Sequence, residues 1–235
     1  MRALVLELDA LPSLREATEA ADVDLAAAAT LAELAGVDAV RLGVSPDGKP
    51  VRVEDVRDTR RAARRLELRM APAESLVRMA LDVQPHQVLL AAEGSEGRSA
   101  ARPLDLRQGA KGLGAAMRAL REAGIGVAML VPPSLDAVKA AHTAGAAGVE
   151  LFTGGIVDLP SAERRSELQQ LGDAARLGAK LDLEVGVGGG LSYRSLPEVL
   201  AASGAAERVA VGRAALARAL LVGLDRALRD LRALL

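Results

Sequence analysis

The 235-residue chain has no cysteine and no tryptophan, and Phe152 and Tyr193 are its only phenylalanine and tyrosine. Without cysteine it has no disulfide, no thiolate nucleophile and no cysteine metal site. Sites that stack nucleic-acid bases need aromatic platforms, so the scarcity of aromatics argues against them. The formal net charge of −1 at pH 7 provides no long-range attraction to nucleic acid either. We therefore expect no nucleic-acid partner.

Long apolar runs are also missing from the chain. The longest, Ala214–Leu224, is interrupted by Arg218 and followed by Asp225, so we expect no membrane span. The N-terminal segment Met1–Asp9 is typical of a strand rather than of a secretory signal. We expect a cytoplasmic protein without a membrane partner.

Histidine is scarce, with only His86 and His142. His86 precedes a strand-like segment and is expected to be structural. His142 lies near the end of a helical segment, where it can stabilise the C-terminal end through the helix dipole. No cluster of His, Asp and Glu shows ligand spacing. We therefore expect no metal.

The chain is rich in short apolar segments that alternate with amphipathic helical ones. Each apolar segment is four to seven residues long, as expected of parallel strands buried on both faces. Eight β-then-α units without a linker predict a single (β/α)8 TIM barrel over residues 1–235; the alternative is an open sheet. The expected strands are Ala3–Leu8, Ala39–Gly43, Glu67–Met70, Gln87–Ala91, Ile125–Leu130, Gly148–Phe152, Leu181–Val187 and Arg208–Gly212.

Glycine and serine positions suggest where several helices begin and end. Ser134, after two prolines, is expected to cap the start of a helix. The glycines expected to end helices are Gly36, Gly124, Gly145 and Gly178.

Three further segments have expected roles outside the barrel wall. Arg15–Ala21 and Glu93–Arg102 are candidate lid loops on the catalytic face. The C-terminal segment Ala214–Leu235 is expected to form one helix that packs on the barrel. Its exposed side is a candidate contact in a homo-oligomer.

Two glycine-containing segments, Gly186–Gly190 and Val211–Arg213, fall at the ends of the last two expected strands. Barrels of this class bind phosphoryl groups at that place. Glycine permits close approach and positive φ, so backbone N–H groups can face an anion. Arg213 opens the last helix, whose N-terminus also favours negative charge. The alternative interpretation is a pair of tight turns without a ligand.

An ordered set of short motifs runs along almost the whole chain. They are Leu8-Asp9, Leu14-Arg15, Ala32–Asp38, Val53–Val56, Leu68–Ala71, Gln84–His86, Pro103–Leu106, Glu150–Gly154, Gly188–Tyr193 and Val211–Ala214. In order and spacing, this set resembles the pyridoxine 5′-phosphate synthase family. The resemblance implies a cofactor-free, oligomeric barrel that condenses two phosphorylated substrates, 1-deoxy-D-xylulose 5-phosphate and 3-amino-2-oxopropyl phosphate.

The resemblance also implies that two histidines and a glutamate transfer protons in the reaction. In this chain those positions hold Gly43, Gly189 and Arg69. Because replacing one proton-transfer group costs roughly 10²–10⁴-fold in rate, we expect little of the family's reaction to remain.

Several strand-end side chains are candidates for a changed site. Asp9 survives from the family's pattern after the first strand, and Asp9 and Glu150 are the catalytic candidates. Glu7 and Glu150 could act as bases if burial raised their pKa, or they form structural ion pairs. Arg69 either pairs with Asp9, Glu7 or a ligand phosphate, or it fills and neutralises a vacated acidic site. The candidate partners of the carboxylates are Arg2, Arg41 and Arg69.

Ligand-binding candidates come from the glycine segments and from positions that match the family. Ser99 could replace a threonine hydroxyl of the family. The full set is Arg69, Ser99, Thr153, Gly154, Gly188, Gly189, Gly190, Gly212 and Arg213.

Three functions are left open. The barrel binds a phosphorylated small molecule but lacks the family's reaction, or synthase activity survives with Asp9, Glu150 and water. In the third, the barrel is an interaction scaffold without a small-molecule site. Fold alone does not decide among them, because function depends on the site.

Overall fold

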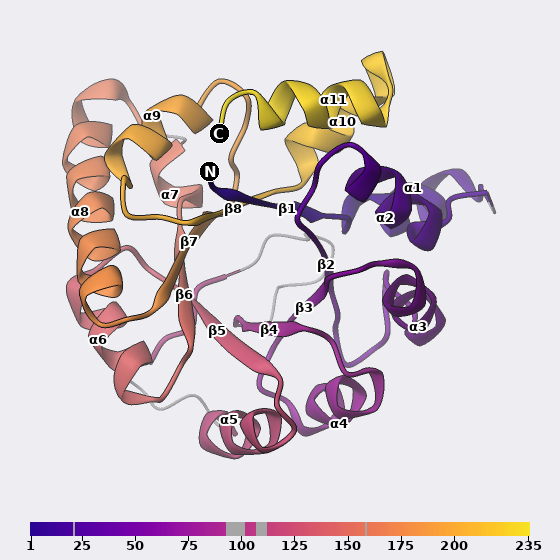
Figure 1. Ribbon diagram of the computed structural model, residues 1–235, viewed down its shortest axis with the longest axis horizontal. Coiled ribbons are helices and arrows are strands. Elements are labelled where there is room, and N and C mark those ends of the chain that lie inside the picture. Colours follow the sequence, from indigo (N-terminus) through magenta and orange to yellow (C-terminus); the bar gives the residue numbers. More distant parts are fainter. Residues whose placement is uncertain (21, 93–101, 107–111, 158) are drawn as a thin grey trace.

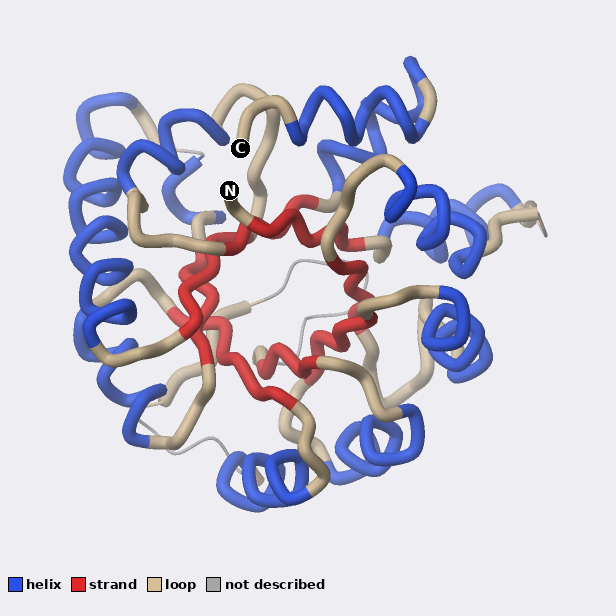
Figure 2. Tube along the Cα trace, in the orientation of Figure 1, coloured by secondary structure: helices blue, strands red, loops and turns tan. Residues whose placement is uncertain are grey.

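The computed structural model describes residues 1–20, 22–92, 102–106, 112–157 and 159–235. Eight parallel strands form a closed barrel in which each strand pairs with the next and β8 pairs with β1 (Figure 2). This confirms the predicted (β/α)8 TIM barrel and excludes the open sheet. The strands are β1 (Ala3–Glu7), β2 (Ala39–Gly43), β3 (Leu66–Met70), β4 (Gln87–Leu90), β5 (Gly126–Val131), β6 (Gly148–Phe152), β7 (Glu184–Gly188) and β8 (Arg208–Val211).

Helices surround the barrel on its outer side (Figure 1). In the described part of the chain they are α1 (Ala10–Thr18), α2 (Leu25–Leu34), α3 (Val53–Ala62), α4 (Glu74–Val83), α5 (Leu113–Glu122), α6 (Leu135–Thr143), α7 (Gly154–Val157), α8 (Ser161–Lys180), α9 (Leu196–Ala202), α10 (Arg213–Val222) and α11 (Leu224–Arg232). None of these described helices is long and apolar enough to span a membrane.

The alternation of side chains along each strand divides the core into two parts. In β1, Leu4 and Leu6 are fully buried and belong to the main hydrophobic core with residues of the helices. Val5 instead packs with Ala39 and Ala210 of the two neighbouring strands. Because successive side chains of a strand point to opposite faces, the residue two positions after Val5, Glu7, also faces the lumen.

Local signals place most helix ends as expected. Ser134 Oγ accepts a hydrogen bond from Ala137 N at the start of α6, which confirms the predicted cap. Gly36, Gly124 and Gly145 each have φ between 74° and 97° directly after a helix, a conformation that glycine adopts without steric cost.

The prediction that Gly178 ends a helix was wrong. It lies inside α8, which continues to Lys180, and the chain turns at Asp182 with φ of 56°. A Cβ at Gly178 would lie 2.7 Å from Val185 Cγ2, so glycine here allows α8 to approach β7 closely. The longer helix also explains why β7 begins at Glu184 rather than at Leu181.

Two predicted segments outside the barrel wall also differ. Most of the expected lid loop after β1 is helical, because α1 extends to Thr18. Arg15 of this segment forms a two-pronged ion pair with Asp55 at 2.7 and 2.8 Å. The prediction of a single C-terminal helix is wrong as well. Gly223, with φ of 82° and ψ of 155°, separates α10 from α11, and the two helices pack against each other. The other expected lid, residues 93–102, lies almost wholly outside the described residues.

Candidate functional site

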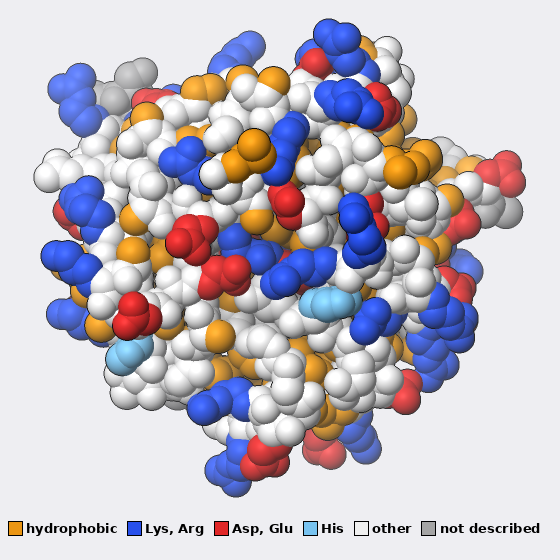
Figure 3. Space-filling model, in the orientation of Figure 1, with side chains coloured by type: hydrophobic (Ala, Val, Ile, Leu, Met, Phe, Trp, Pro, Cys, Tyr) orange, Lys and Arg blue, Asp and Glu red, His pale blue; other side chains and the backbone are white. Residues whose placement is uncertain are grey.

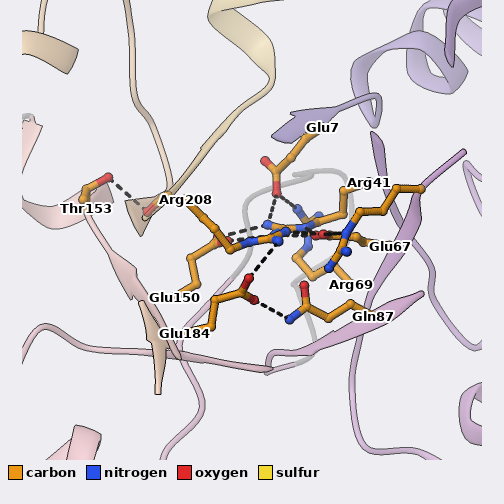
Figure 4. Close-up of polar contacts among 11 residues, drawn as sticks. Glu7, Arg41, Glu67, Arg69, Gln87, Glu150, Thr153, Glu184 and Arg208 are labelled. Carbon is orange, nitrogen blue, oxygen red and sulfur yellow. Dashed lines mark hydrogen bonds and ion pairs between the residues drawn. The ribbon is translucent and has the colours of Figure 1, made fainter. Parts of the chain in front are cut away.

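Charged side chains from six strands meet inside the barrel, where their labelled heads point toward one another (Figure 4). They come from inward-facing strand positions, and several are almost fully buried. Buried charges are tolerated only when they are paired. We call these side chains, together with the amide of Gln87 in β4 and the carboxylate of Asp9 just after β1, the lumen cluster: Glu7, Asp9, Arg41, Glu67, Arg69, Gln87, Glu150, Glu184 and Arg208.

Arg41 of β2 lies at the centre of the lumen cluster. Its guanidinium is 3.0 Å from Glu67 Oε2, 2.8 Å from Glu150 Oε2 and 3.3 Å from Glu7 Oε1. These three carboxylates raise the pKa of Arg41 well above its ordinary value in spite of burial. Glu150 is therefore held by a structural ion pair, one of the two roles that the sequence left open for it.

The lumen cluster continues toward the C-terminal ends of the strands through Arg69 of β3. Arg69 Nη2 lies 2.6 Å from Asp9 Oδ2, and Nη1 lies 2.9 Å from Glu7 Oε1. The second oxygen of Asp9 accepts the N–H of Gly43 at 2.6 Å. Arg69 thus pairs with both of the carboxylates expected for it, and Asp9 has both oxygens engaged.

Toward the opposite end of the barrel, Arg208 of β8 is the cation that pairs with the carboxylates. It contacts Glu67 and lies 3.2 Å from Glu184 Oε1, and Glu184 accepts a hydrogen bond from Gln87 Nε2 at 3.0 Å. Basic and acidic side chains also gather at the centre of the face that Figure 3 shows. The lumen cluster therefore runs through the barrel from Asp9 to Glu184.

Burial and pairing shift the carboxylate pKa values in opposite directions. Burial raises the pKa of Asp9, and the nearby charge of Glu7 adds to the rise, against the opposing effect of Arg69. Burial also acts to raise the pKa of Glu7, but Arg69 and Arg41 together bring it below its ordinary value. The pKa of Glu67 is likewise lowered, in spite of burial, by Arg41 and Arg208. Of these three carboxylates, only Asp9 has its pKa raised.

Gly43 and Arg69, two of the three positions where the resemblance implies proton-transfer groups, are paired at the mouth. A Cβ built on Gly43 would lie 2.6 Å from Arg69 Nη2 and 3.0 Å from Asp9 Oδ2. The space next to Gly43 is therefore filled by the Arg69–Asp9 ion pair.

The third of these positions, Gly189, lies against Phe152, the only phenylalanine of the chain. A Cβ at Gly189 would be 2.6 Å from the Phe152 ring, and one at Gly154 would be 2.4 Å from the tip of the same ring. Phe152 packs on an apolar group of lumen residues from β4 and β5: Leu89, Ala91, Ala128 and Leu130. The ring thus occupies the space beside the glycine loop.

The predicted phosphate segments follow neighbouring strands, since Gly188 of β7 is paired with Ala210 of β8. Gly189 and Gly190 have φ of 98° and 73°, the conformation for which glycine was expected. Among the described residues, no hydrogen bond uses the N–H groups of Gly189, Gly190 or Leu191 as donors. This loop therefore presents backbone donors without partners in the described part of the chain.

Gly212 and Arg213 complete this side of the mouth. A Cβ at Gly212 would lie 2.9 Å from Glu7 Cβ, so glycine lets the start of α10 approach β1. Arg213 is the first residue of α10 and is exposed. Across the described ranges its side chain forms no ion pair. Its guanidinium and the helix N-terminus both favour an anion.

The side chain of Thr153 is buried and hydrogen-bonded to the backbone, whereas a ligand-binding side chain was expected. It is fully buried, and its Oγ1 lies 2.6 Å from Gly189 O and 3.0 Å from Gly188 O. Gly154 follows it as the first residue of the short helix α7. Ser99 lies outside the described residues.

Neither histidine enters the site. His86 precedes β4, and its Nδ1 accepts a hydrogen bond from Leu66 N at 3.2 Å; burial and then Arg60 and Arg65 lower its pKa. His142 is in the last turn of α6, as expected. Within the described residues, no group of three or more His, Cys, Asp or Glu could hold a metal ion.

The part of the lumen cluster that sequence reasoning missed is Glu67, Gln87, Glu184 and Arg208. A signal was present in β3, where Glu67 and Arg69 alternate with apolar residues. Two charges at alternate positions of a buried strand point into the same lumen and need partners there.

Comparison with known proteins identifies the relatives of this chain. The family model described as pyridoxal phosphate biosynthesis protein PdxJ matches residues 4–235. Pyridoxine 5′-phosphate synthase of Geobacter metallireducens is 35% identical over 233 residues, which cover 98% of this chain and 97% of the relative. The enzyme of the same name from Desulforapulum autotrophicum is 34% identical over 237 residues, covering 100% and 99% of the two chains.

Solved structures show the likeness of fold at lower identity. Tryptophan synthase of Mycobacterium tuberculosis matches with a TM-score of 0.65 and 19% identity, covering 99% of this chain and 92% of that one. Identity this low supports the barrel fold alone. The family match and the curated relatives extend over nearly the whole length, and the chain therefore belongs to the PdxJ family of pyridoxal phosphate biosynthesis proteins.

Proposed function

We propose that this barrel binds a phosphorylated small molecule of vitamin B6 biosynthesis and has lost or changed the condensation reaction of pyridoxine 5′-phosphate synthase. Family membership supports the link to B6 biosynthesis. The glycine loop and Arg213 support phosphate binding, because unpaired backbone donors and a cation at a helix N-terminus suit a phosphate dianion.

The observation that carries the proposed change of reaction is the filled space at the mouth. Gly43 and Gly189 offer no proton-transfer group, and Arg69, with its pKa raised by Asp9 and Glu7, stays charged. The Arg69–Asp9 pair and the Phe152 ring stand where side chains at positions 43 and 189 would go. The substitutions therefore form a packed arrangement rather than a set of vacancies.

The first experiment is a calorimetric titration of the purified protein with 1-deoxy-D-xylulose 5-phosphate, with inorganic phosphate as the control. We expect saturable binding of the sugar phosphate. A turnover assay with this compound and 3-amino-2-oxopropyl phosphate accompanies it, and product at an enzyme-like rate would overturn the proposed loss. Absence of heat with both ligands would favour the interaction scaffold.

A second candidate function, a surviving synthase, is favoured by one observation. Burial raises the pKa of Asp9 at the C-terminal mouth, which suits a general acid or base. Both Asp9 oxygens are engaged, by Arg69 and by the Gly43 N–H, so this role requires the pair to open. In that case Asp9→Asn abolishes product formation in the turnover assay, whereas His86→Gln, far from the mouth, leaves it unchanged.

A further inference from the structure

The buried hydroxyl of Thr153 has an unusual pair of partners. Its side chain is 0% exposed, and its Oγ1 shares one proton between the carbonyls of Gly188 and Gly189, at 3.0 and 2.6 Å. The Thr153 N–H also donates to Gly188 O at 2.8 Å. Two consecutive peptide groups of the glycine loop are thus held by one residue of the adjacent β6–α7 connection.

Holding these two carbonyls also fixes the direction of two N–H groups. In a trans peptide the C=O and N–H point in opposite directions. With the carbonyls of Gly188 and Gly189 turned to Thr153, the N–H groups of Gly189 and Gly190 point away from it. Gly189 is half-buried and Gly190 is exposed, so both donors lie at the surface of the mouth.

The Gly188 carbonyl is also held by the Thr153 N–H, but among the described residues only the Thr153 hydroxyl holds the Gly189 carbonyl and so sets the direction of the Gly190 N–H. Gly189 and Gly190 have positive φ and no side chain, and glycine peptides rotate at little steric cost. The Phe152 ring limits the space beside Gly189, but it forms no hydrogen bond that would choose one peptide orientation. The direction of the Gly190 N–H therefore depends on the Thr153 hydroxyl.

We propose that Thr153 is a positioning residue that presents the Gly189 and Gly190 N–H groups to the phosphate of a phosphate monoester, without contacting that phosphate itself. This rests on the proposed function, since it assumes that the glycine loop binds an anion. It assigns to Thr153 a role different from the direct contact expected from the sequence.

The test compares Thr153→Val with Thr153→Ser in the full chain. Valine is close in shape but lacks the hydroxyl, and leaves Gly189 O without its donor; serine keeps the hydroxyl. With inorganic phosphate as the probe in calorimetry, we expect roughly tenfold weaker binding for Thr153→Val and near-native binding for Thr153→Ser. In 15N-glycine-labelled protein, the signals of Gly189 and Gly190 shift on adding phosphate in the wild type and in Thr153→Ser.

The outcomes separate the two proposals. Wild-type protein that binds neither phosphate nor the sugar phosphate contradicts the proposed function and this inference together. Phosphate binding in which Thr153→Val equals the wild type overturns the positioning role alone. Equal weakening in Thr153→Val and Thr153→Ser also overturns it, because the hydroxyl would then not be the determinant. Should Thr153→Val fail to fold, Thr153→Ala replaces it in the same comparison.

Discussion

The two sides of the barrel mouth are built on opposite principles. On the β1–β3 side, Asp9, Glu7 and Arg69 hold one another at 2.6 to 2.9 Å. On the β7–β8 side, the glycine loop and Arg213 present donors that have no partner among the described residues. The first side has satisfied its charges internally, whereas the second has donors to offer a ligand.

This difference separates stability from binding. Charges buried in mutual contact contribute to the fold chiefly because breaking one pair leaves the other charge uncompensated. Exposed donors contribute little to the fold and can be removed at small cost. We therefore expect substitutions on the β1–β3 side to change the free energy of unfolding, and those on the β7–β8 side to change affinity for anions.

The largest effect is expected for Arg69→Met. Removing the guanidinium leaves Asp9 and Glu7 buried without their shared cation, which should lower the free energy of unfolding by about 3–5 kcal/mol. Urea unfolding measures it. The control is Arg57→Met, which breaks an exposed pair with Asp82 and should cost far less, because solvent screens that pair. Equal losses in the two variants would contradict the comparison.

The next effect in size concerns the filled space at Gly43. Alanine there brings Cβ within 2.6 Å of Arg69 Nη2 and 3.0 Å of Asp9, and we expect a cost of about 1–3 kcal/mol. Gly186→Ala is the matched control, because its Cβ would meet only ordinary contacts at 3.5 Å or more.

A double-variant cycle sharpens this test of packing. Because the close neighbour of a side chain at position 43 is Arg69, the cost of Gly43→Ala should shrink in an Arg69→Ala background, whereas additive costs would show that the two positions are independent. Coupling would also mean that placing a histidine at position 43 requires a smaller residue at position 69.

Acid should destabilise the lumen cluster, because ion pairs lower the pKa values of two of its carboxylates. The pKa of Glu67 and that of Glu7 lie below their ordinary 4.5 in the folded protein. Their stabilisation is present above that value and is lost as pH falls through the lower folded pKa. The pKa of Asp9 is raised, so Asp9 acts in the opposite sense: its contribution lowers the free energy of unfolding as pH rises above 3.8.

Urea unfolding between pH 6 and 3 measures this dependence. We expect the free energy of unfolding to fall with pH below about 4.5, and Glu67→Gln to reduce that slope. Asp58→Asn, at an exposed ion pair with Arg61, should leave the slope as it is. An unchanged slope in Glu67→Gln would mean that acid acts through other groups.

The sequence predicted the barrel well because its signals are local and periodic. Strands such as Gly126–Val131 are apolar runs, and Ser134 and Gly36 mark helix ends by chemistry that needs no tertiary context. Gly178 misled because a glycine that ends a helix and one that allows close packing on Val185 look the same in sequence.

The site was predictable only in part, for a related reason. The resemblance drew attention to Gly43, Arg69 and Gly189, and Arg69 was expected to have Asp9, Glu7 or a ligand phosphate as a partner. That its guanidinium fills the space at Gly43 depends on the pairing and register of β1 with β2 and of β2 with β3, which place Gly43 directly opposite Arg69. The partners of Thr153 depend likewise on the pairing of β6 with β7.

The smallest effect on stability, and the most direct probe of the second side, is expected for Arg213→Gln. The side chain is exposed and forms no ion pair in the described part of the chain, so the free energy of unfolding should change by less than about 0.5 kcal/mol. Affinity for 1-deoxy-D-xylulose 5-phosphate should fall about tenfold, because a charge-assisted hydrogen bond to phosphate is lost. Arg61→Gln, on the distant α3, should leave the calorimetric affinity unchanged. A loss of stability without a loss of affinity in Arg213→Gln would reverse the assignment of the two sides, because the exposed side would then support the fold and the ligand would have to bind elsewhere.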